Sequence, residues 1–221
     1  MNEFFELGVM RITSKFKPRA HTAGKAVSKA VLFAGLLALS SCTSLIAPPA
    51  PDTYDITAPT TFPGLKGGSR AQILILEPSA LKVLDSLDIV IKPNDAVVQY
   101  LAKAQWTDRL PKVVQARLIE SFENTGRVRA VAKPGEGLVI DYQIVSDIRA
   151  FQADLGNGTS QAVVSISVKL VSDRTGKVIR AKVFSKGEPL ASSSPIEVVT
   201  TLDEAFDDVA RQIVSWVFAG V

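Results

Sequence analysis

The stretch from Leu138 to Phe184 alternates apolar and polar residues in three segments, and this pattern constrains the fold more than any other feature. An Asn157-Gly158 pair separates the first two segments, and residues 173–176 form a turn signal before the third. Alternation places the apolar side chains on one face of a strand, and Asn-Gly is typical of a tight hairpin turn. The pattern therefore predicts a three-stranded antiparallel meander with one apolar and one polar face.

Two amphipathic helices are expected to cover the apolar face. The first has Asp108 as its N-cap, Pro111 in its first turn and Gly126 as its stop, and the second carries apolar residues at helical spacing from Val199 to Val217. Three shorter strands are expected before the first helix, over residues 71–77, 88–91 and 97–101. These elements predict an α+β fold: a two-layer sandwich in which a mostly antiparallel sheet carries two main helices on one face.

The first 41 residues have the order of a secretory signal, with a basic segment before the apolar run 30–39 and small residues after it. An apolar run of 10 residues spans about half of a roughly 30 Å hydrocarbon core, so it is too short for a transmembrane helix. The sequence Leu-Ser-Ser-Cys that ends at Cys42 resembles a bacterial lipobox, in which a diacylglyceryl group is joined to the thiol. We therefore expect the mature chain to begin at a lipidated Cys42, with translation starting at Met1 or Met10.

A segment rich in proline, threonine and glycine follows Cys42 and extends to Ser69. Such a composition favours extended polyproline geometry, and its 27 residues could reach about 80 Å at most. Tyr54 interrupts the segment within a short Tyr-Asp-Ile stretch that could add an edge strand. The expected organisation is a signal over residues 1–41, a lipidated cysteine with its tether over 42–69, and a globular domain over 70–221.

The composition after residue 41 excludes many catalytic chemistries. The single histidine, His21, lies in the predicted signal, and Cys42 is the single cysteine. Without an imidazole or a free thiol, the mature chain has no Ser/His or Cys/His nucleophile pair, no zinc site of His or Cys, and no disulfide. We therefore expect a protein that is not an enzyme and that has no catalytic, cofactor-binding or metal-binding residues.

The net charge of +3 belongs to the predicted signal rather than to the mature chain. Of the 25 basic and 22 acidic residues, six basic but only two acidic ones precede Cys42. The remainder is close to neutral, so no nucleic-acid partner is indicated.

Two sets of residues allow both a functional and a structural interpretation. Tyr54 and Trp106 are candidate partner contacts, although an aromatic residue beside a helix start, such as Trp106, also fits the core. Four acidic residues near the start of the second helix fit a calcium site, an acid/base pair or a solvated helix face favoured by the helix dipole. They are Asp203, Glu204, Asp207 and Asp208.

Several short motifs together resemble the ABC-type transport auxiliary lipoproteins of the PqiC-like group. They are the lipidated cysteine, Tyr54-Asp55-Ile56, the Ile-Leu-Ile-Leu-Glu-Pro run over 73–78, Asp88-Ile89-Val90, and the Trp-x-x-x-Leu-Pro helix entry over 106–111. The resemblance implies a fold like the N-terminal domain of TolB. It also implies an accessory subunit of a lipid-trafficking system built on mammalian-cell-entry (MCE) domains, anchored by lipid at the periplasmic face of the Gram-negative outer membrane. Thr43, where an inner-membrane retention signal often has Asp, favours that location.

Three functional hypotheses follow. The first is a non-catalytic auxiliary component of an ABC/MCE phospholipid transport system, with an MCE-domain protein as partner and a homo-oligomer as an open alternative. The second is an outer-membrane assembly or scaffold lipoprotein of the TolB N-terminal-domain type. The third is a carboxylate-dependent envelope hydrolase, which requires two carboxyl groups about 5 to 9.5 Å apart in a cleft.

Overall fold

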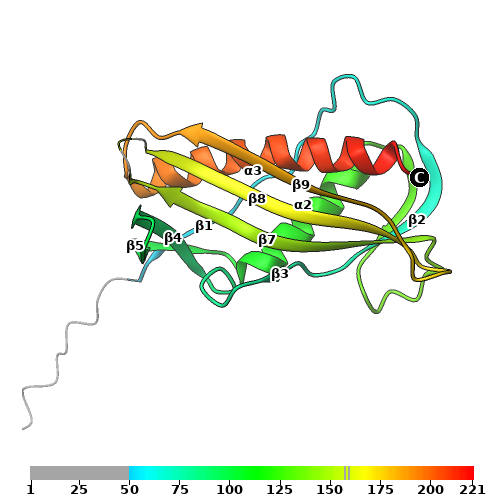
Figure 1. Ribbon diagram of the computed structural model, residues 1–221, viewed down its shortest axis with the longest axis horizontal. Helices are drawn as coiled ribbons and strands as arrows, with labels where there is room; N and C mark the ends of the chain where they lie inside the picture. The colour runs from blue at the N-terminus through cyan, green and yellow to red at the C-terminus, as the bar shows by residue number, and fades with distance from the viewer. Residues whose placement is uncertain (1–49, 157, 159) are drawn as a thin grey trace, which may run out of the picture. The chain divides into compact units, whose positions relative to one another are not determined.

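One long strand, β7 (Tyr142–Asp154), pairs with other strands along both of its edges (Figure 1). The computed structural model describes residues 50–156, 158 and 160–221. Cys42 and the predicted signal lie outside these described residues.

The first edge of β7 carries the predicted meander. β8 (Gln161–Ser172) pairs antiparallel with β7 along its length, and β9 (Val178–Pro189) pairs antiparallel with β8. In β8 the alternate residues from Ala162 to Leu170 are buried, while the residues between them are partly or fully exposed. The alternation read from the sequence therefore matches the two faces of the sheet.

The second edge of β7 is assembled from three short strands, all parallel to it. β2 (Ser69–Ile75) pairs with the start of β7, β3 (Ser79–Ala80) with its middle and β4 (Asp88–Asn94) with its end. Farther out lie β6 (Val128–Ala132) beside β2, β5 (Val97–Trp106) beside β4, and β1 (Asp52–Tyr54) beside β5. The long ladders are antiparallel as expected, but the sequence did not predict the five short parallel pairings.

Both helices lie on one face of this nine-stranded sheet, as the α+β prediction requires (Figure 1). α3 (Pro195–Phe218) packs mainly on β8 and β9, and α2 (Leu110–Asn124) packs on β2 and β6. The N-cap of α2 is Arg109 rather than Asp108, whose carboxylate instead accepts the Arg109 N–H at 2.7 Å. Gly126 follows the helix with φ +61°, a left-handed conformation that glycine adopts at little cost.

Trp106 belongs to the core between the sheet and the helices. Its side chain is 1% exposed. The centroids of the Trp106 and Phe151 rings lie 5.7 Å apart in an edge-to-face arrangement. Phe151 in turn lies 6.2 Å from Phe206 of α3. The structure therefore corrects the candidate assignment of Trp106 as a partner contact, because the sheet and helix already enclose it.

The segment expected to be a tether up to Ser69 is docked on the domain from Asp52 onward. An edge strand forms as expected, but it covers Asp52–Tyr54 rather than residues 54–56, and Ile56 just beyond it is 1% exposed. The predicted boundary at residue 70 is therefore wrong, because apolar residues within the proline-rich segment are part of the core.

Candidate docking surfaces

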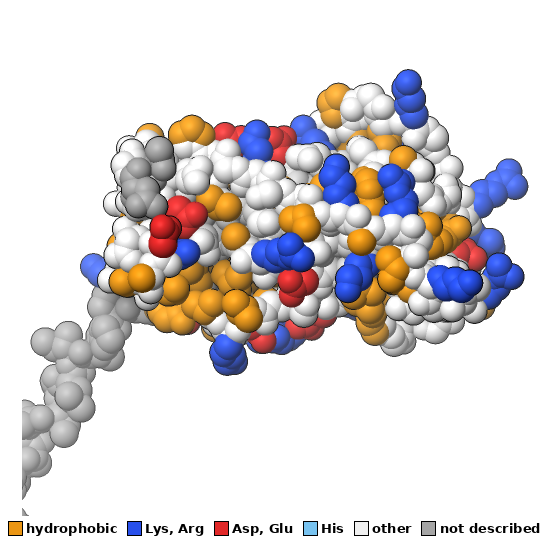
Figure 2. Space-filling model, viewed as in Figure 1, with side chains coloured by type: hydrophobic (Ala, Val, Ile, Leu, Met, Phe, Trp, Pro, Cys, Tyr) orange, Lys and Arg blue, Asp and Glu red, His pale blue; other side chains and the backbone are white. Residues whose placement is uncertain are grey.

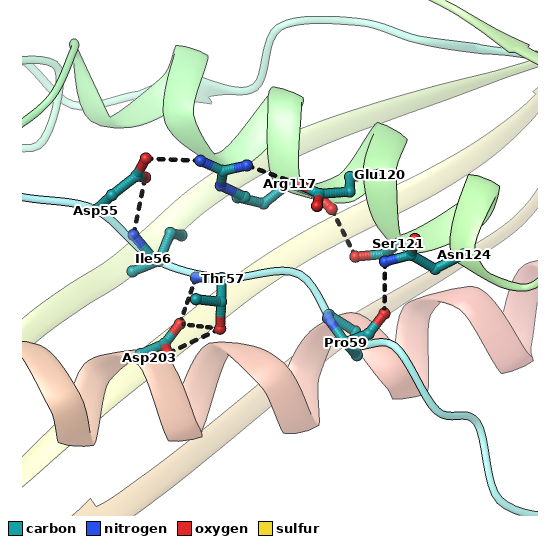
Figure 3. A network of polar contacts seen from close by, with 9 residues as sticks. All are labelled: Asp55, Ile56, Thr57, Pro59, Arg117, Glu120, Ser121, Asn124 and Asp203. Atoms are coloured by element: carbon teal, nitrogen blue, oxygen red, sulfur yellow. Dashed lines mark hydrogen bonds and ion pairs between the residues drawn. The ribbon is translucent and has the colours of Figure 1, made fainter.

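Residues 55–59, here called the strap, run between α2 and α3 (Figure 3). Ile56 and Pro59 of the strap are buried, while the residues between and around them are at least partly exposed. The strap follows β1 directly and thus joins the entry point of the chain to both helices.

Two polar contacts attach the strap to α2, one through Arg117 and one through Asn124. The Asp55 carboxylate accepts a hydrogen bond from Arg117 at 2.6 Å, and Arg117 also binds Glu120 at 2.6 Å (Figure 3). Burial tends to lower the pKa of Arg117, but its hydrogen bonds with Glu120 and Asp55 outweigh this effect and raise it. Asn124 donates its side-chain N–H to the carbonyl of Pro59 at 3.1 Å.

The attachment to α3 depends on Asp203. Its carboxylate accepts the backbone N–H of Thr57 at 2.6 Å and the Thr57 hydroxyl at 2.9 Å (Figure 3). The strap therefore connects both helices to the end of β1 through short polar contacts.

Asp207 and Asp208 of α3 have basic partners rather than a shared ligand site, and Glu204 is exposed. Asp207 pairs with Arg211 at 2.7 Å, and Asp208 pairs with Lys186 at 2.8 Å. Burial raises the pKa of Asp207, and Arg211 offsets part of that shift. Among the described residues no group of three or more His, Cys, Asp or Glu could hold a metal ion. The ion pairs of Asp207 and Asp208 fit the interpretation of a solvated helix face.

Tyr54 is half-buried at the end of β1, where its carbonyl accepts the N–H of Thr107 at 2.9 Å. Its side chain keeps some exposed surface, whereas Trp106 beside it in the ladder has almost none. Of the two predicted contact residues, only Tyr54 therefore has surface for a partner, and it also packs against the core.

Basic side chains gather at the far end of the sheet, around the starts of β2 and β6 and the turn after β8 (Figure 2). Two adjoining hollows of about 670 and 550 Å³ share Ser69 and Arg70. Two carboxylates, Asp141 and Asp173, line the larger hollow. The four arginines that line the two hollows outnumber them and define the cationic end: Arg70, Arg127, Arg129 and Arg174. Sequence reasoning missed this surface because the four residues come from three separate parts of the chain.

A third hollow, of about 460 Å³, is lined by two carboxylates, Glu77 and Glu136, together with Lys112 and Lys133. Glu77 pairs with Arg109 at 3.1 Å, and Glu136 accepts the backbone N–H of Lys133 at 3.3 Å. Both carboxylates therefore already have partners within the protein. The geometry does not favour the hydrolase hypothesis.

A family comparison matches residues 54–214 to the model described as the ABC-type transport auxiliary lipoprotein component. The chain belongs to this family. The match confirms the resemblance read from the sequence motifs, and it begins at Tyr54, so the strap is part of the domain that the transport auxiliary lipoproteins share.

The protein bll6063 of Bradyrhizobium diazoefficiens is 31% identical over 191 residues, which are 85% of this chain and 50% of that protein. The chain therefore spans about half the length of this curated relative.

The crystal structure of protein XCC0632 from Xanthomonas campestris has a TM-score of 0.71 at 24% identity and covers 76% of this chain and 96% of that one. A second crystal structure has a TM-score of 0.59 at 12% identity, covering 76% of this chain and 99% of that one. These two likenesses support the α+β fold of the transport auxiliary lipoprotein. Within the part of the chain that the structure describes, no helix is long and apolar enough to cross a membrane.

Proposed function

We propose that this protein is a lipid-anchored, non-catalytic subunit of an ABC-type transporter built on MCE domains, which moves phospholipid between the membranes of a Gram-negative envelope. Family membership supports the transport role, and the lipobox ending at Cys42 supports the anchor. The observation that carries the proposal is the strap. The strap follows the segment that leads from the predicted anchor, and it binds side chains of both helices. Such a connection is expected of a domain held at a membrane.

The docked strap shortens the predicted tether. Asp52 follows Cys42 by 10 residues, and an extended chain spans at most about 3.6 Å per residue. The first strand therefore lies within about 36 Å of the lipidated sulfur. A domain held this closely works at the membrane surface rather than across the periplasm.

The outer membrane is the proposed location, because Thr43 follows the lipidated cysteine in place of an inner-membrane retention signal. A diacylglyceryl group supplies two acyl chains, and two chains are enough for stable anchoring. The absence of histidine and free thiol after Cys42 supports a role in binding rather than in chemistry.

The cationic end is the proposed contact surface for the transporter. It lies at the end of β7 opposite the entry of the chain, and 13 residues of extended strand span about 40 Å. Arginine forks bind carboxylates in bidentate fashion, so the complementary surface on the MCE-domain protein is expected to be acidic.

Crosslinking in native envelopes tests the proposal. An affinity-tagged copy of the full chain, expressed in its native cell, is crosslinked, solubilised and purified, and the attached proteins are identified by mass spectrometry. We expect an MCE-domain protein to be recovered. Recovery of the tagged protein alone, while the transporter is present in the same membranes, would contradict the proposal. Recovery of outer-membrane assembly proteins instead would support the scaffold hypothesis.

A further inference from the structure

The β4–β5 hairpin exposes apolar side chains near its turn. Val97 is 39% exposed, Val98 is 45% exposed and Tyr100 is 51% exposed. We call residues 92–103 the hairpin tip. Figure 2 shows hydrophobic side chains gathered over β4 and β5, where the chain enters the described domain. Adjacent exposed apolar residues on a soluble domain often mark a binding surface.

The direction of β1 places the hairpin tip at the end of the domain where the described chain begins. β1 pairs parallel with β5, with Asp52 opposite Ala104 and Tyr54 opposite Trp106. The part of β5 that precedes Ala104 therefore extends past the start of β1, toward the end from which the chain arrives. Since Cys42 precedes Asp52 by only 10 residues, a lipid at Cys42 holds this end close to a bilayer.

The chemistry of the hairpin tip fits the interface of a bilayer. Tyrosine is enriched at the headgroup level, where its ring lies in an apolar layer and its hydroxyl in a polar one. The hairpin tip carries two lysines, Lys92 and Lys103, against one acidic residue, Asp95, at its turn. Lysine side chains extend their charge toward anionic headgroups.

The backbone of the hairpin limits how deeply it can enter. In the described part of the chain, β1 pairs only with residues 104–106 of β5, so the preceding residues have no strand on that side. Unpaired backbone groups are costly in hydrocarbon, so the tip belongs at the level of the headgroups.

We propose that the hairpin tip binds the phospholipid bilayer beside the lipid anchor, so that the domain contacts the membrane at two points. The inference rests on the proposed lipidation of Cys42. Two contacts restrict the tilt of the domain. Attachment at one lipidated residue alone leaves the tilt free. The cationic end then faces away from the bilayer, toward the proposed partner.

A fluorescence measurement on the full-length, lipidated protein tests this inference. The protein is reconstituted into vesicles of phosphatidylethanolamine and phosphatidylglycerol. A single cysteine is introduced by Val98→Cys and labelled with an environment-sensitive dye, since the sulfur of Cys42 is acylated. The matched control is Val178→Cys, because Val178 is also an exposed strand valine (55%) but lies at the opposite end of the sheet.

The label at position 98 is expected to shift its emission to shorter wavelength and to be quenched by brominated lipids. The label at position 178 is expected to behave as it does in water. If the protein floats with the vesicles but both labels report water, the inference is wrong while the anchor stands. A label at 98 that is shielded but not quenched by the lipids would indicate a protein neighbour, such as a second copy, and would also overturn it.

Flotation of the unlabelled protein separates this inference from the function on which it depends. Failure to float with the vesicles would overturn the lipid anchor of the proposed function, and with it the membrane contact of the hairpin tip.

Discussion

The two ends of β7 present opposite surfaces that are built in different ways. The hairpin tip exposes apolar side chains from one local hairpin, whereas the cationic end collects arginines from β2, the start of β6 and the turn after β8. Residues 42–221 are almost neutral in sum, so their composition hides this polarity. Function at the two ends therefore depends on how the fold distributes charge and apolar surface rather than on their totals.

Removing the anchor is expected to have the largest effect on this comparison. Cys42→Ala removes the proposed acylation site, so the protein should pass completely from the membrane fraction to the soluble fraction or keep its signal. The interfacial contact of one hairpin is too small to replace two acyl chains. Fractionation and intact-mass measurement check the result. A Cys42→Ala protein that is processed and still sediments with membranes would show that the hairpin end binds without lipid.

The connection between the anchor end and the helices can be broken next, at the strap. Ile56→Ala removes most of a side chain that is 1% exposed and should lower the free energy of unfolding by about 2 to 5 kcal/mol. Thr57→Ala removes one hydroxyl contact with Asp203 from the same strap and should cost about 1 kcal/mol. Urea unfolding of both variants checks the order. Equal small losses would mean that the strap is not part of the core.

The sequence predicted the elements whose signals are local. The meander around β7 follows from alternation and from turn residues, and the first helix follows from Pro111, its apolar spacing and Gly126. These signals lie within the segments themselves, so no knowledge of distant partners was needed. The misplaced cap at Asp108 is a shift of one residue, which is typical for helix boundaries.

The parallel pairings and the strap could not be predicted in the same way. Ile73 pairs with Tyr142, and Thr57 binds a carboxylate 146 residues away. Proline and glycine in the segment before Ser69 indicated a tether, but the buried Ile56 outweighs that composition. Such contacts join segments that are far apart in the sequence, so neither segment alone carries a signal that predicts them.

Of the two candidate partner contacts, Tyr54 stays a prediction, because its side chain is only partly buried. Trp106 is in the core, since an aromatic residue beside a helix start fits both the core and the surface. The cationic end escaped notice for a different reason. Its arginines are scattered along a nearly neutral chain, and only the sheet order brings them together.

Reversing charges at the cationic end is expected to weaken the partner contact with little effect on folding. The double variant Arg70→Glu/Arg174→Glu should reduce recovery of the crosslinked MCE-domain protein about tenfold, with a smaller effect at high salt. The free energy of unfolding should change by less than about 1 kcal/mol, since exposed charges contribute little to it. The matched control, Lys82→Glu/Arg149→Glu, reverses two exposed charges elsewhere. Equal losses in both variants would mean that overall charge, and not the cationic end, attracts the partner.

The smallest effects are expected from two residues with nearly the same backbone angle at the two ends. Lys103 in the hairpin tip has φ +60°, and Gly126 beside the cationic end has φ +61°. A left-handed conformation costs a residue with a Cβ about 1 to 2 kcal/mol, so Lys103→Gly should raise the free energy of unfolding by up to about 1 kcal/mol. Gly126→Ala should lower it by about 1 kcal/mol.

The open space around Gly126 makes this pair of substitutions informative. A Cβ added at Gly126 would meet nothing within 4 Å, so any loss of stability there comes from the backbone conformation alone. Urea unfolding of both variants should therefore show effects of opposite sign. A loss of stability in Lys103→Gly as well would mean that contacts of the lysine side chain outweigh the strain of its backbone. Side-chain contacts of Lys103 would then stabilise the conformation of the hairpin tip in the free protein.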